Sequence, residues 1–294
     1  MLISALPSTN RENLCKSLAE VHALLQDVRA AGPGPARSRL FRYLEWASKA
    51  TDRLRHQISP ADIDRLVLTR RYELLLSSFG SSAGASSENL VNSLVTLETD
   101  ERSAAFEEAM EALNRQITRW IRPAAFVVAD SSFYIQHPEK LEEADLAAIC
   151  NLREEPIHLL FPMVVVDELD GLKQSNKTRW RAGYTLAVLD RILGESGTSG
   201  TAILREEDYT PLQSQGIPRG EITVEILFDP PGHRRLPIND DEIIDRALAI
   251  QPYTGSVVTL LTYDTGQATR ARAAGLRFIK LRDSAGEGPE PAKA

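Results

Sequence analysis

Residues 125–130 read AFVVAD, an apolar run that ends in an aspartate. Two later stretches follow the same pattern: residues 157–168 (IHLLFPMVVVDE) and residues 256–264 (SVVTLLTYD) are apolar runs that also end in acids. Continuous apolar runs between helical segments are typical of strands that are buried on both faces of a parallel sheet. The sequence therefore predicts an α/β fold with a parallel sheet for this half of the chain.

The segments between these runs complete the prediction. The predicted strands cover residues 125–129, 157–166 and 256–262, and the predicted helices cover residues 138–153, 177–193, 240–250 and 265–274. Between residues 194 and 237 the pattern favours β structure, in which residues 201–204 and 222–228 are suited to pair as a hairpin. The tail after Asp283 is rich in Gly, Pro and Glu, so we expect it to be disordered.

Residues 1–122 are predicted to form an all-α helical bundle. Apolar residues recur at helical spacing over residues 11–31, 36–57, 60–78 and 88–120. Gly-Pro-Gly-Pro at residues 32–35 breaks the pattern, Ser59 before Pro60 is an N-cap signal, and a small polar loop is expected at residues 80–87. The predicted domains are residues 1–122 (helical), 123–283 (α/β) and 284–294 (tail).

The composition is that of a soluble globular protein, with 43% hydrophobic and 26% charged residues. No stretch approaches the ~20 apolar residues of a membrane-spanning helix, and Cys15 and Cys150 are expected to remain separate thiols. We therefore expect a cytoplasmic protein without a membrane partner. The net charge of −7 is uneven: residues 1–122 carry 16 basic and 15 acidic side chains, whereas residues 123–294 carry 18 and 26.

The acids that follow the predicted strands are the candidate functional residues. Asp130, Glu168 and Asp264 each follow a different strand, and ligands of open α/β sheets bind beyond the carboxyl ends of the strands. Asp240 and Asp241 open a helix after the β-rich region. Taken singly, each acid could simply cap a helix or complement its dipole. Together they would repel one another, a cost that divalent cations relieve, and oxygen-only ligands favour Mg²⁺ or Mn²⁺ over zinc.

Four segments resemble the motifs of PIN-domain nucleases, in the order in which that family has them. These are FVVADSS (126–132), FPMVVVDELDGLK (161–173), NDDEIIDRAL (239–248) and VTLLTYD (258–264). The likeness covers roughly residues 124–282 and is greatest to the larger PIN domains found beside PhoH-type ATPases and in the nuclease of nonsense-mediated decay. It implies a three-layer α/β/α fold and metal-dependent hydrolysis of RNA phosphodiester bonds.

The resemblance assigns a role to individual residues. The first, second and fourth acids of the family fall on Asp130, Glu168 and Asp264. For the third, aligning Ala247-Leu248 with the family's small-apolar pair favours Asp240, with its neighbour Asp241 as the alternative. These acids are expected to bind one or two Mg²⁺ or Mn²⁺ ions and to be catalytic. Two small polar residues, Ser132 and Thr262, are expected to orient these acids without binding the metal ion themselves.

A basic segment follows the Glu168 motif and is a candidate for binding single-stranded RNA. Its cationic residues are Lys173, Lys177, Arg179 and Arg181. They could neutralise phosphates while Trp180 or Tyr184 stacks on a base. The alternative is a solvated helix face with Trp180 packed inward. The helical region is a candidate for self-association or for docking a protein partner.

Two classes of function fit these patterns. The first is a metal-dependent endoribonuclease. The alternative is a non-cleaving PIN-like module that binds RNA or a protein, which would apply if the third acid is misplaced. A structure-specific DNA nuclease would use the same carboxylates, so the sequence leaves the choice between DNA and RNA open.

Overall fold

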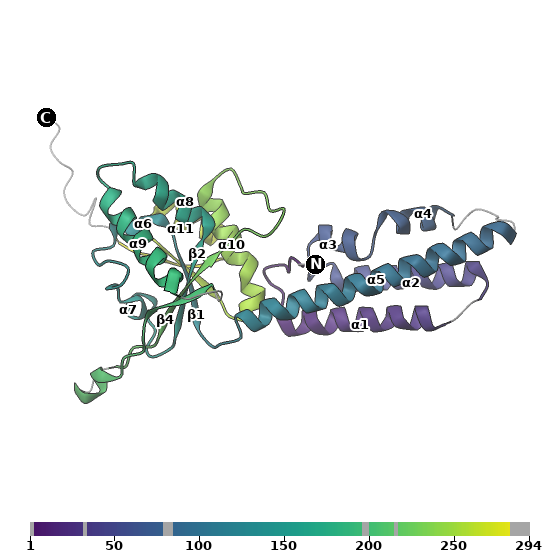
Figure 1. The fold of residues 1–294 in the computed structure, drawn as a ribbon, viewed down its shortest axis with the longest axis horizontal. Helices are drawn as coiled ribbons and strands as arrows, with labels where there is room; N and C mark the ends of the chain where they lie inside the picture. The colour runs from purple at the N-terminus through teal and green to yellow at the C-terminus, as the bar shows by residue number, and fades with distance from the viewer. Residues whose placement is uncertain (1–2, 32–33, 79–84, 196–199, 215–216, 283–294) are drawn as a thin grey trace. The chain divides into compact units, whose positions relative to one another are not determined.

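The chain folds into two compact units, Met1–Ile121 and Arg122–Ala294 (Figure 1). The computed structural model describes residues 3–31, 34–78, 85–195, 200–214 and 217–282. Most of the loop predicted at residues 80–87 and all of the predicted tail lie outside the described residues. Both cysteines are free thiols. Among the described residues, no helix combines the length and the apolar character that crossing a membrane requires.

Helices alone make up the regular structure described in the first unit. They are α1 (Arg11–Ala30), α2 (Ala36–Leu54), α3 (Pro60–Leu66), α4 (Arg70–Ser78) and α5 (Ala85–Arg119). The predicted N-cap residue Ser59 is confirmed, because its side chain accepts a hydrogen bond from the Asp62 amide in the first turn of α3. The core lies between α1, α2 and α5, where the rings of Tyr43, Trp46 and Phe106 pack together.

Two boundaries in this unit differ from the prediction. The helix expected over residues 60–78 is two helices, because the chain leaves helical geometry at Val67 and the Thr69 hydroxyl caps the next helix by accepting from the Tyr72 amide at 3.1 Å. The last helix begins at Ala85, three residues before the predicted start, so residues 85–87 of the expected loop are helical. Small residues such as Ala and Ser are compatible with a first helical turn as well as with a loop.

The second unit is built on a six-stranded sheet. Its strands are β1 (Ala125–Ala129), β2 (Ile157–Pro162), β3 (Thr201–Arg205), β4 (Ile222–Leu227), β5 (Val258–Thr262) and β6 (Arg277–Lys280). The strands lie side by side in the order β3-β4-β2-β1-β5-β6. All neighbours are parallel except the β3–β4 pair, which is the predicted hairpin. The predicted α/β fold with a parallel sheet is confirmed.

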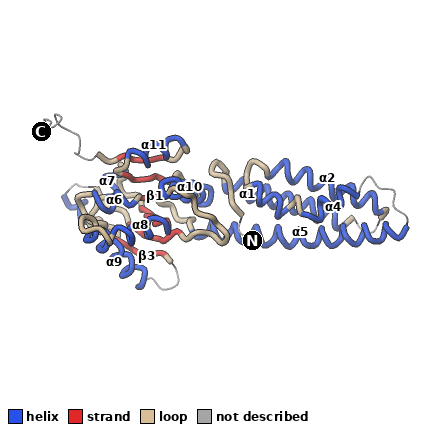
Figure 2. Tube along the Cα trace, turned by 90° about the horizontal axis from the view of Figure 1, so that it is seen from above, coloured by secondary structure: helices blue, strands red, loops and turns tan. Residues whose placement is uncertain are grey.

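Helices cover the sheet on both sides (Figure 2). They are α6 (Ser131–Gln136), α7 (Leu146–Cys150), α8 (Met163–Leu172), α9 (Arg179–Glu195), α10 (Asn239–Thr254) and α11 (Thr265–Ala273). Helices α8 and α10 contact β2, while α10 and α11 contact β5. Every residue of β2 and β5 is buried, as expected for strands with covered faces.

The prediction that one strand runs over residues 157–166 is wrong after Pro162. Strand β2 ends there and α8 begins at Met163, with Pro162 as its N-cap residue. Proline lacks an amide hydrogen, and its fixed φ suits entry into a helix. Val164 and Val165 are fully buried within α8, so tertiary packing overrides their local preference for strands. Glu168 therefore lies on a helix rather than at a strand end.

Three further elements differ from the prediction because the sequence patterns that mark them are short. The helix predicted over residues 138–153 is only α7, which ends where Asn151 adopts a left-handed conformation with φ of 55°. Helix α6 and strand β6 were not predicted. Strand β6 is a four-residue edge strand whose first residue is exposed and whose other residues are half-buried, so it lacks the continuous apolar run that marks a central strand.

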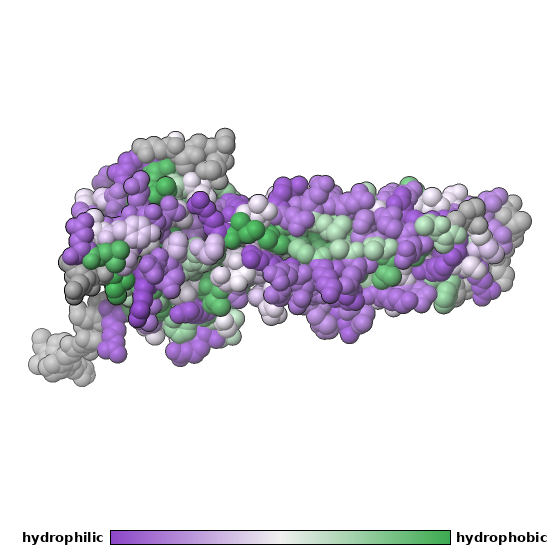
Figure 3. Space-filling model, turned by 90° about the horizontal axis from the view of Figure 1, so that it is seen from below, coloured by the Kyte–Doolittle hydropathy of each residue, from purple (hydrophilic) through white to green (hydrophobic). Residues whose placement is uncertain are grey.

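Exposed apolar side chains are spread over the surface of the helical unit. On the face drawn in Figure 3, hydrophobic residues lie between larger hydrophilic areas. The most exposed large apolar residues of this unit are Leu74, Ile121 and Leu90, at 62%, 60% and 59%. Single exposed apolar residues are common on soluble proteins, so they do not by themselves define a docking surface.

Candidate active site

The predicted acids follow the four central parallel strands at their carboxyl ends. Asp130 comes directly after β1, and Asp264 comes two residues after β5. Glu168 lies in the second turn of α8, which follows β2 directly, and Asp240 lies in the first turn of α10, which follows β4 after an eleven-residue connection, residues 228–238. The topology thus brings acids from distant parts of the chain to one edge of the sheet.

Asp130 is the buried centre of this edge, with 4% of its surface exposed. Its carboxylate accepts hydrogen bonds from the Ser132 hydroxyl at 2.6 Å, the Thr262 hydroxyl at 2.6 Å and the Phe133 amide at 3.1 Å. Burial raises the pKa of Asp130, the charge of Glu168 raises it further, and the three hydrogen bonds oppose that rise. The site therefore holds a desolvated carboxylate in a fixed orientation.

Thr262 and Ser132 tie the ends of β1 and β5 together. Besides donating to Asp130, the Thr262 hydroxyl accepts from the Asp264 amide at 2.8 Å. The Ser132 hydroxyl accepts from the Tyr263 amide at 2.9 Å. Through these hydrogen bonds both small residues fix the positions of Asp130 and of the chain that leads to Asp264.

Asp264 is both a helix cap and an exposed acid. Its side chain accepts from the Gln267 amide at 2.9 Å at the start of α11. A side chain at Gly266 would bring its Cβ to 2.9 Å from the Asp264 carboxylate, closer than real Cβ contacts. Gly266 thus keeps the space beside this acid clear, a role that sequence reasoning missed because a single glycine in a helix start carries no specific signal.

Glu168 is linked to α10 through a residue that sequence reasoning also missed. The Asn239 side-chain amide donates to the Glu168 carboxylate at 2.8 Å. Asn239 is the first residue of α10 and stands next to Asp240 in the sequence. Its position beside the third acid is the signal that could have indicated a role in the site.

The structure separates the two candidates for the third acid. The pKa of Asp240 is raised by partial burial, and then by the charges of Asp264 and Glu168, while Arg270 opposes the rise. Asp241 instead forms an ion pair with Arg270, whose guanidinium lies 2.9 and 3.1 Å from its two oxygens. Arg270 also reaches Asp240, but only at 3.8 Å from its Nε to the carboxylate. Asp240 therefore lies closer to the other acids in its electrostatic surroundings, whereas Asp241 holds the nearer contact with the base.

The four acids form an open group. Among the described residues, no three of them bring carboxylate oxygens within 4.8 Å of one another, a spacing that only Asp229, His233 and Glu242 reach. Next to burial, the charge of Glu168 contributes to the raised pKa of Asp130, and the charges of Asp264 and Glu168 contribute to that of Asp240, which indicates negative charge concentrated at this edge. Donors that are all oxygen, in a region of excess negative charge, fit Mg²⁺ or Mn²⁺, and binding would draw the carboxylates closer.

The predicted basic segment is only partly free of internal partners. Lys173, the C-cap residue of α8, pairs with Asp170 on that helix at 2.5 Å, and Arg181 donates to the backbone carbonyl of Glu139 at 2.9 Å. Lys177 and Arg179 are exposed. The segment therefore offers cationic side chains at the start of α9, two of which are held by neighbouring structure.

An aromatic pair lies in the same segment. Trp180 is 62% exposed and does not pack into the core, and its ring stacks on Tyr184 with centroids 5.6 Å apart and planes inclined by 19°. The Lys140 ammonium lies 5.6 Å from the Tyr184 ring. Exposed tryptophan carries a cost in hydration, so a surface that retains one is a candidate contact surface.

An open, mostly parallel α/β sheet with acids gathered at its carboxyl edge defines the class to which the second unit belongs. The family model described as PIN domain matches residues 127–282, more than half of the 294 residues, and the chain therefore belongs to the PIN domain family. This confirms the resemblance of the four motifs. PIN domains generally have a nuclease-type fold and use divalent metal ions. The helical unit lies outside the matched residues, and a search of curated proteins found no match.

Proposed function

We propose that this chain is a metal-dependent endoribonuclease whose Mg²⁺ or Mn²⁺ ions bind Asp130, Glu168, Asp240 and Asp264. The observation that carries the proposal is the placement of these four acids after the four central parallel strands, at one edge of the sheet. Burial raises the pKa of Asp130 and of Asp240, and the charges of neighbouring acids add to the rise. A structural role for an acid is normally accompanied by a base, as Arg270 accompanies Asp241. Acids that face one another at the carboxyl edge of a sheet are more simply explained by a cation.

Bound ions would supply an activated water and charge stabilisation for the phosphate under attack. The residues of the chain would provide the positions. Ser132 and Thr262 hold the Asp130 carboxylate at a fixed angle, and Asn239 holds Glu168. Preorganised ligands lose little freedom when an ion binds, which favours both affinity and geometry.

The direct test is Asp130→Asn, assayed on a single-stranded RNA with Mn²⁺. We expect cleavage to fall by more than about 100-fold, because the change removes a ligand and even the loss of an outer-shell partner typically costs 10–100-fold. Full activity in the variant would contradict the proposal.

The matched control is Asp170→Asn on α8. This carboxylate is 66% exposed and pairs with Lys173, so its loss removes the same charge without reaching the acid group. We expect its activity to stay within about 3-fold of the wild type. An equal loss in both variants would indicate that total charge, rather than a bound ion, controls the reaction.

Single-stranded RNA is the substrate that the surface near α9 supports best. Exposed Trp180 offers a stacking platform and exposed Lys177 and Arg179 offer phosphate contacts. A matched pair of RNA and DNA oligonucleotides of one sequence separates a ribonuclease from a DNA nuclease. Preferential cleavage of the DNA would contradict the RNA assignment while leaving the metal chemistry in place.

The non-cleaving module makes a distinct calorimetric prediction. A module without a metal centre should show no Mn²⁺ binding that depends on Asp130 and Asp240. The nuclease is supported over this alternative because Asp240, the third acid, lies near Asp264 and Glu168 and has only the more distant contact of Arg270, at 3.8 Å, to offset their charge. Mn²⁺ binding that is identical in the wild type and in Asp130→Asn would support the non-cleaving module.

A further inference from the structure

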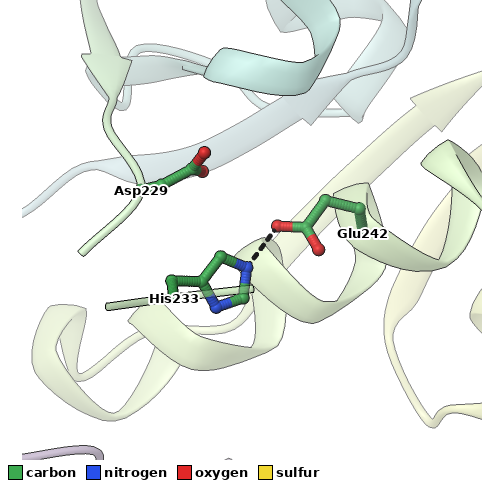
Figure 4. A group of neighbouring side chains, drawn as sticks. All are labelled: Asp229, His233 and Glu242. Carbon is green, nitrogen blue, oxygen red and sulfur yellow. Dashed lines mark hydrogen bonds and ion pairs between the residues drawn. The ribbon is translucent and has the colours of Figure 1, made fainter. Parts of the chain in front are cut away.

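A second group of donor atoms lies outside the four acids. Asp229, His233 and Glu242 each offer one ligand atom, and these atoms all lie within 4.8 Å of one another (Figure 4). Asp229 and His233 belong to the connection between β4 and α10, and Glu242 belongs to the first turns of α10. We propose that these three residues bind one Zn²⁺ ion that anchors this connection to α10.

The chemistry of the donors differs from that of the four acids. One imidazole nitrogen with two carboxylate oxygens is a set that suits Zn²⁺, which is commonly held by three protein ligands and a water, whereas Mg²⁺ prefers oxygen donors alone. His233 Nε2 lies 2.7 Å from Glu242 Oε1. Ligands at zinc distances in a tetrahedral site are about 3.3 Å apart. For the His233–Glu242 pair, replacing the shared proton by an ion therefore needs shifts of less than about 1 Å. Asp229, whose ligand atom lies within 4.8 Å of the other two, would have to move closer by a further amount.

The surroundings of Glu242 and Asp229 also favour the binding of a cation. Glu242 is fully buried, and its second oxygen accepts from the Leu236 amide at 2.8 Å, which orients the carboxylate. The Oδ1 atom of Asp229 is shielded from solvent and has no hydrogen-bond partner among the described residues. A buried acceptor without a partner is costly, and coordination to a cation would satisfy it.

The charged groups around Asp229, His233 and Glu242 have a net negative charge that a divalent cation would balance. Arg235 bridges Asp229 and Asp167, and Arg246 lies near Glu242 and Asp245. These four carboxylates face two guanidinium groups, so two negative charges remain while His233 is neutral. One Zn²⁺ ion would balance them, which removes the usual objection that nearby arginines repel a metal.

The position of the cluster gives the ion a structural role. The connection that it would anchor leads directly into Asn239 and Asp240 at the start of α10. Fixing Asp229 and His233 against Glu242 would restrict this connection and the first turn of the helix. The ion would thus act on the candidate active site through the backbone, without being one of its catalytic ions.

The test is zinc binding by calorimetry and metal analysis on the full chain. The wild type is expected to bind one equivalent of Zn²⁺ that excess Mg²⁺ does not displace. His233→Gln and Asp229→Asn should each weaken binding by more than about 100-fold, since the loss of a ligand exceeds the 10–100-fold cost of an outer-shell change. His56→Gln, which removes an exposed histidine of the helical unit, should bind like the wild type.

Asp130→Asn separates this proposal from the nuclease proposal. This variant should retain the zinc equivalent even though it is expected to lose RNA cleavage. Zinc binding that is absent from the wild type, or unchanged in both His233→Gln and Asp229→Asn, would overturn the zinc site. Circular dichroism in metal-free buffer establishes that each variant is folded, and Asp229→Asn decides the matter if His233→Gln is not.

Limited proteolysis provides a second measurement that does not depend on activity. Arg234 is exposed within the anchored connection and is a trypsin target. Zn²⁺ should slow cleavage after Arg234 at least about 10-fold in the wild type and should have no effect in His233→Gln, because proteolysis requires local opening of the backbone. Equal cleavage with and without Zn²⁺ in the wild type would contradict an anchoring role.

Discussion

Each unit of this protein buries more than one carboxylate, and Glu98 and Asp130 are two of them with opposite surroundings. In the helical unit, Glu98 has 1% of its surface exposed and lies 2.8 Å from Arg71 and 3.2 Å from Arg102. In the PIN unit, Asp130 has 4% exposed, accepts only from uncharged groups, and faces Glu168. Burial alone thus does not distinguish a structural acid from a functional one, whereas the sign of the neighbouring charge does.

The difference follows from the cost of desolvation. Placing a charge in the interior is unfavourable, and a chain that needs the charge only for stability compensates it with a base. An acid that is left beside other acids lowers the stability of the fold unless a cation binds. Proteins tolerate such costs at functional sites, which is what the proposed metal site at the acidic edge of the PIN sheet would require.

The largest expected effect is on the stability of the helical unit. Glu98→Ala leaves Arg71 and Arg102 without their buried partner, and removing one member of a buried ion pair costs about 3–5 kcal/mol. Urea denaturation followed by circular dichroism measures the free energy of unfolding. Asp100→Ala on the same helix, whose carboxylate is 52% exposed, should change it by less than about 0.5 kcal/mol. Similar losses in both variants would remove the contrast between the two units.

The next effect concerns the choice between two adjacent acids. Asp240→Asn removes an acid that faces Glu168 and Asp264, so cleavage should fall more than about 100-fold. Asp241→Asn removes only the partner of Arg270, so cleavage should fall less than about 10-fold. Initial rates at saturating Mn²⁺ give both values. The reverse ranking would assign the third acid to Asp241.

A smaller effect is expected at the exposed tryptophan. Trp180→Ala should weaken binding of single-stranded RNA by about 1–3 kcal/mol if one base stacks on the ring. The change should raise KM and leave kcat near its original value, because the ring is proposed to hold substrate and not to reach the reacting phosphate. Ile203→Ala, another large apolar residue that is about half exposed, is the matched control and should leave KM unchanged.

The smallest expected effect concerns the loss of folding stability that the buried charge of Asp130 causes. The pKa of Asp130 is raised in the folded protein, so its carboxyl is protonated in both states at low pH and the fold loses stability as pH rises through the raised pKa. Asp130→Asn in metal-free buffer should therefore match the wild-type Tm at acidic pH and exceed it by a few degrees at neutral pH. Mn²⁺ should raise the Tm of the wild type and not that of the variant. A lower Tm for the variant at neutral pH would indicate that Asp130 is mainly a structural cap.

The amino-acid sequence determined the architecture where its signals were long. The apolar runs of β1 and β5, the helical periodicity of α1 and α2, and the hairpin of β3 and β4 each follow from local pattern. The order of acids along the chain likewise predicted that Asp130 and Asp264 would follow parallel strands. These features are determined by burial periodicity, which the linear sequence displays directly.

The tertiary structure alone decided how side chains from distant segments face one another. It placed Glu168 on a helix by turning the chain at Pro162, because burial of Val164 and Val165 outweighs their preference for strands. It placed Arg270 closer to Asp241 than to Asp240, and it brought His233 against Glu242. Which of these residues pair depends on the distances between atoms of residues far apart in the chain. Hydrogen-bond and electrostatic energies change strongly with those distances, and the spacing of residues along the sequence does not give them.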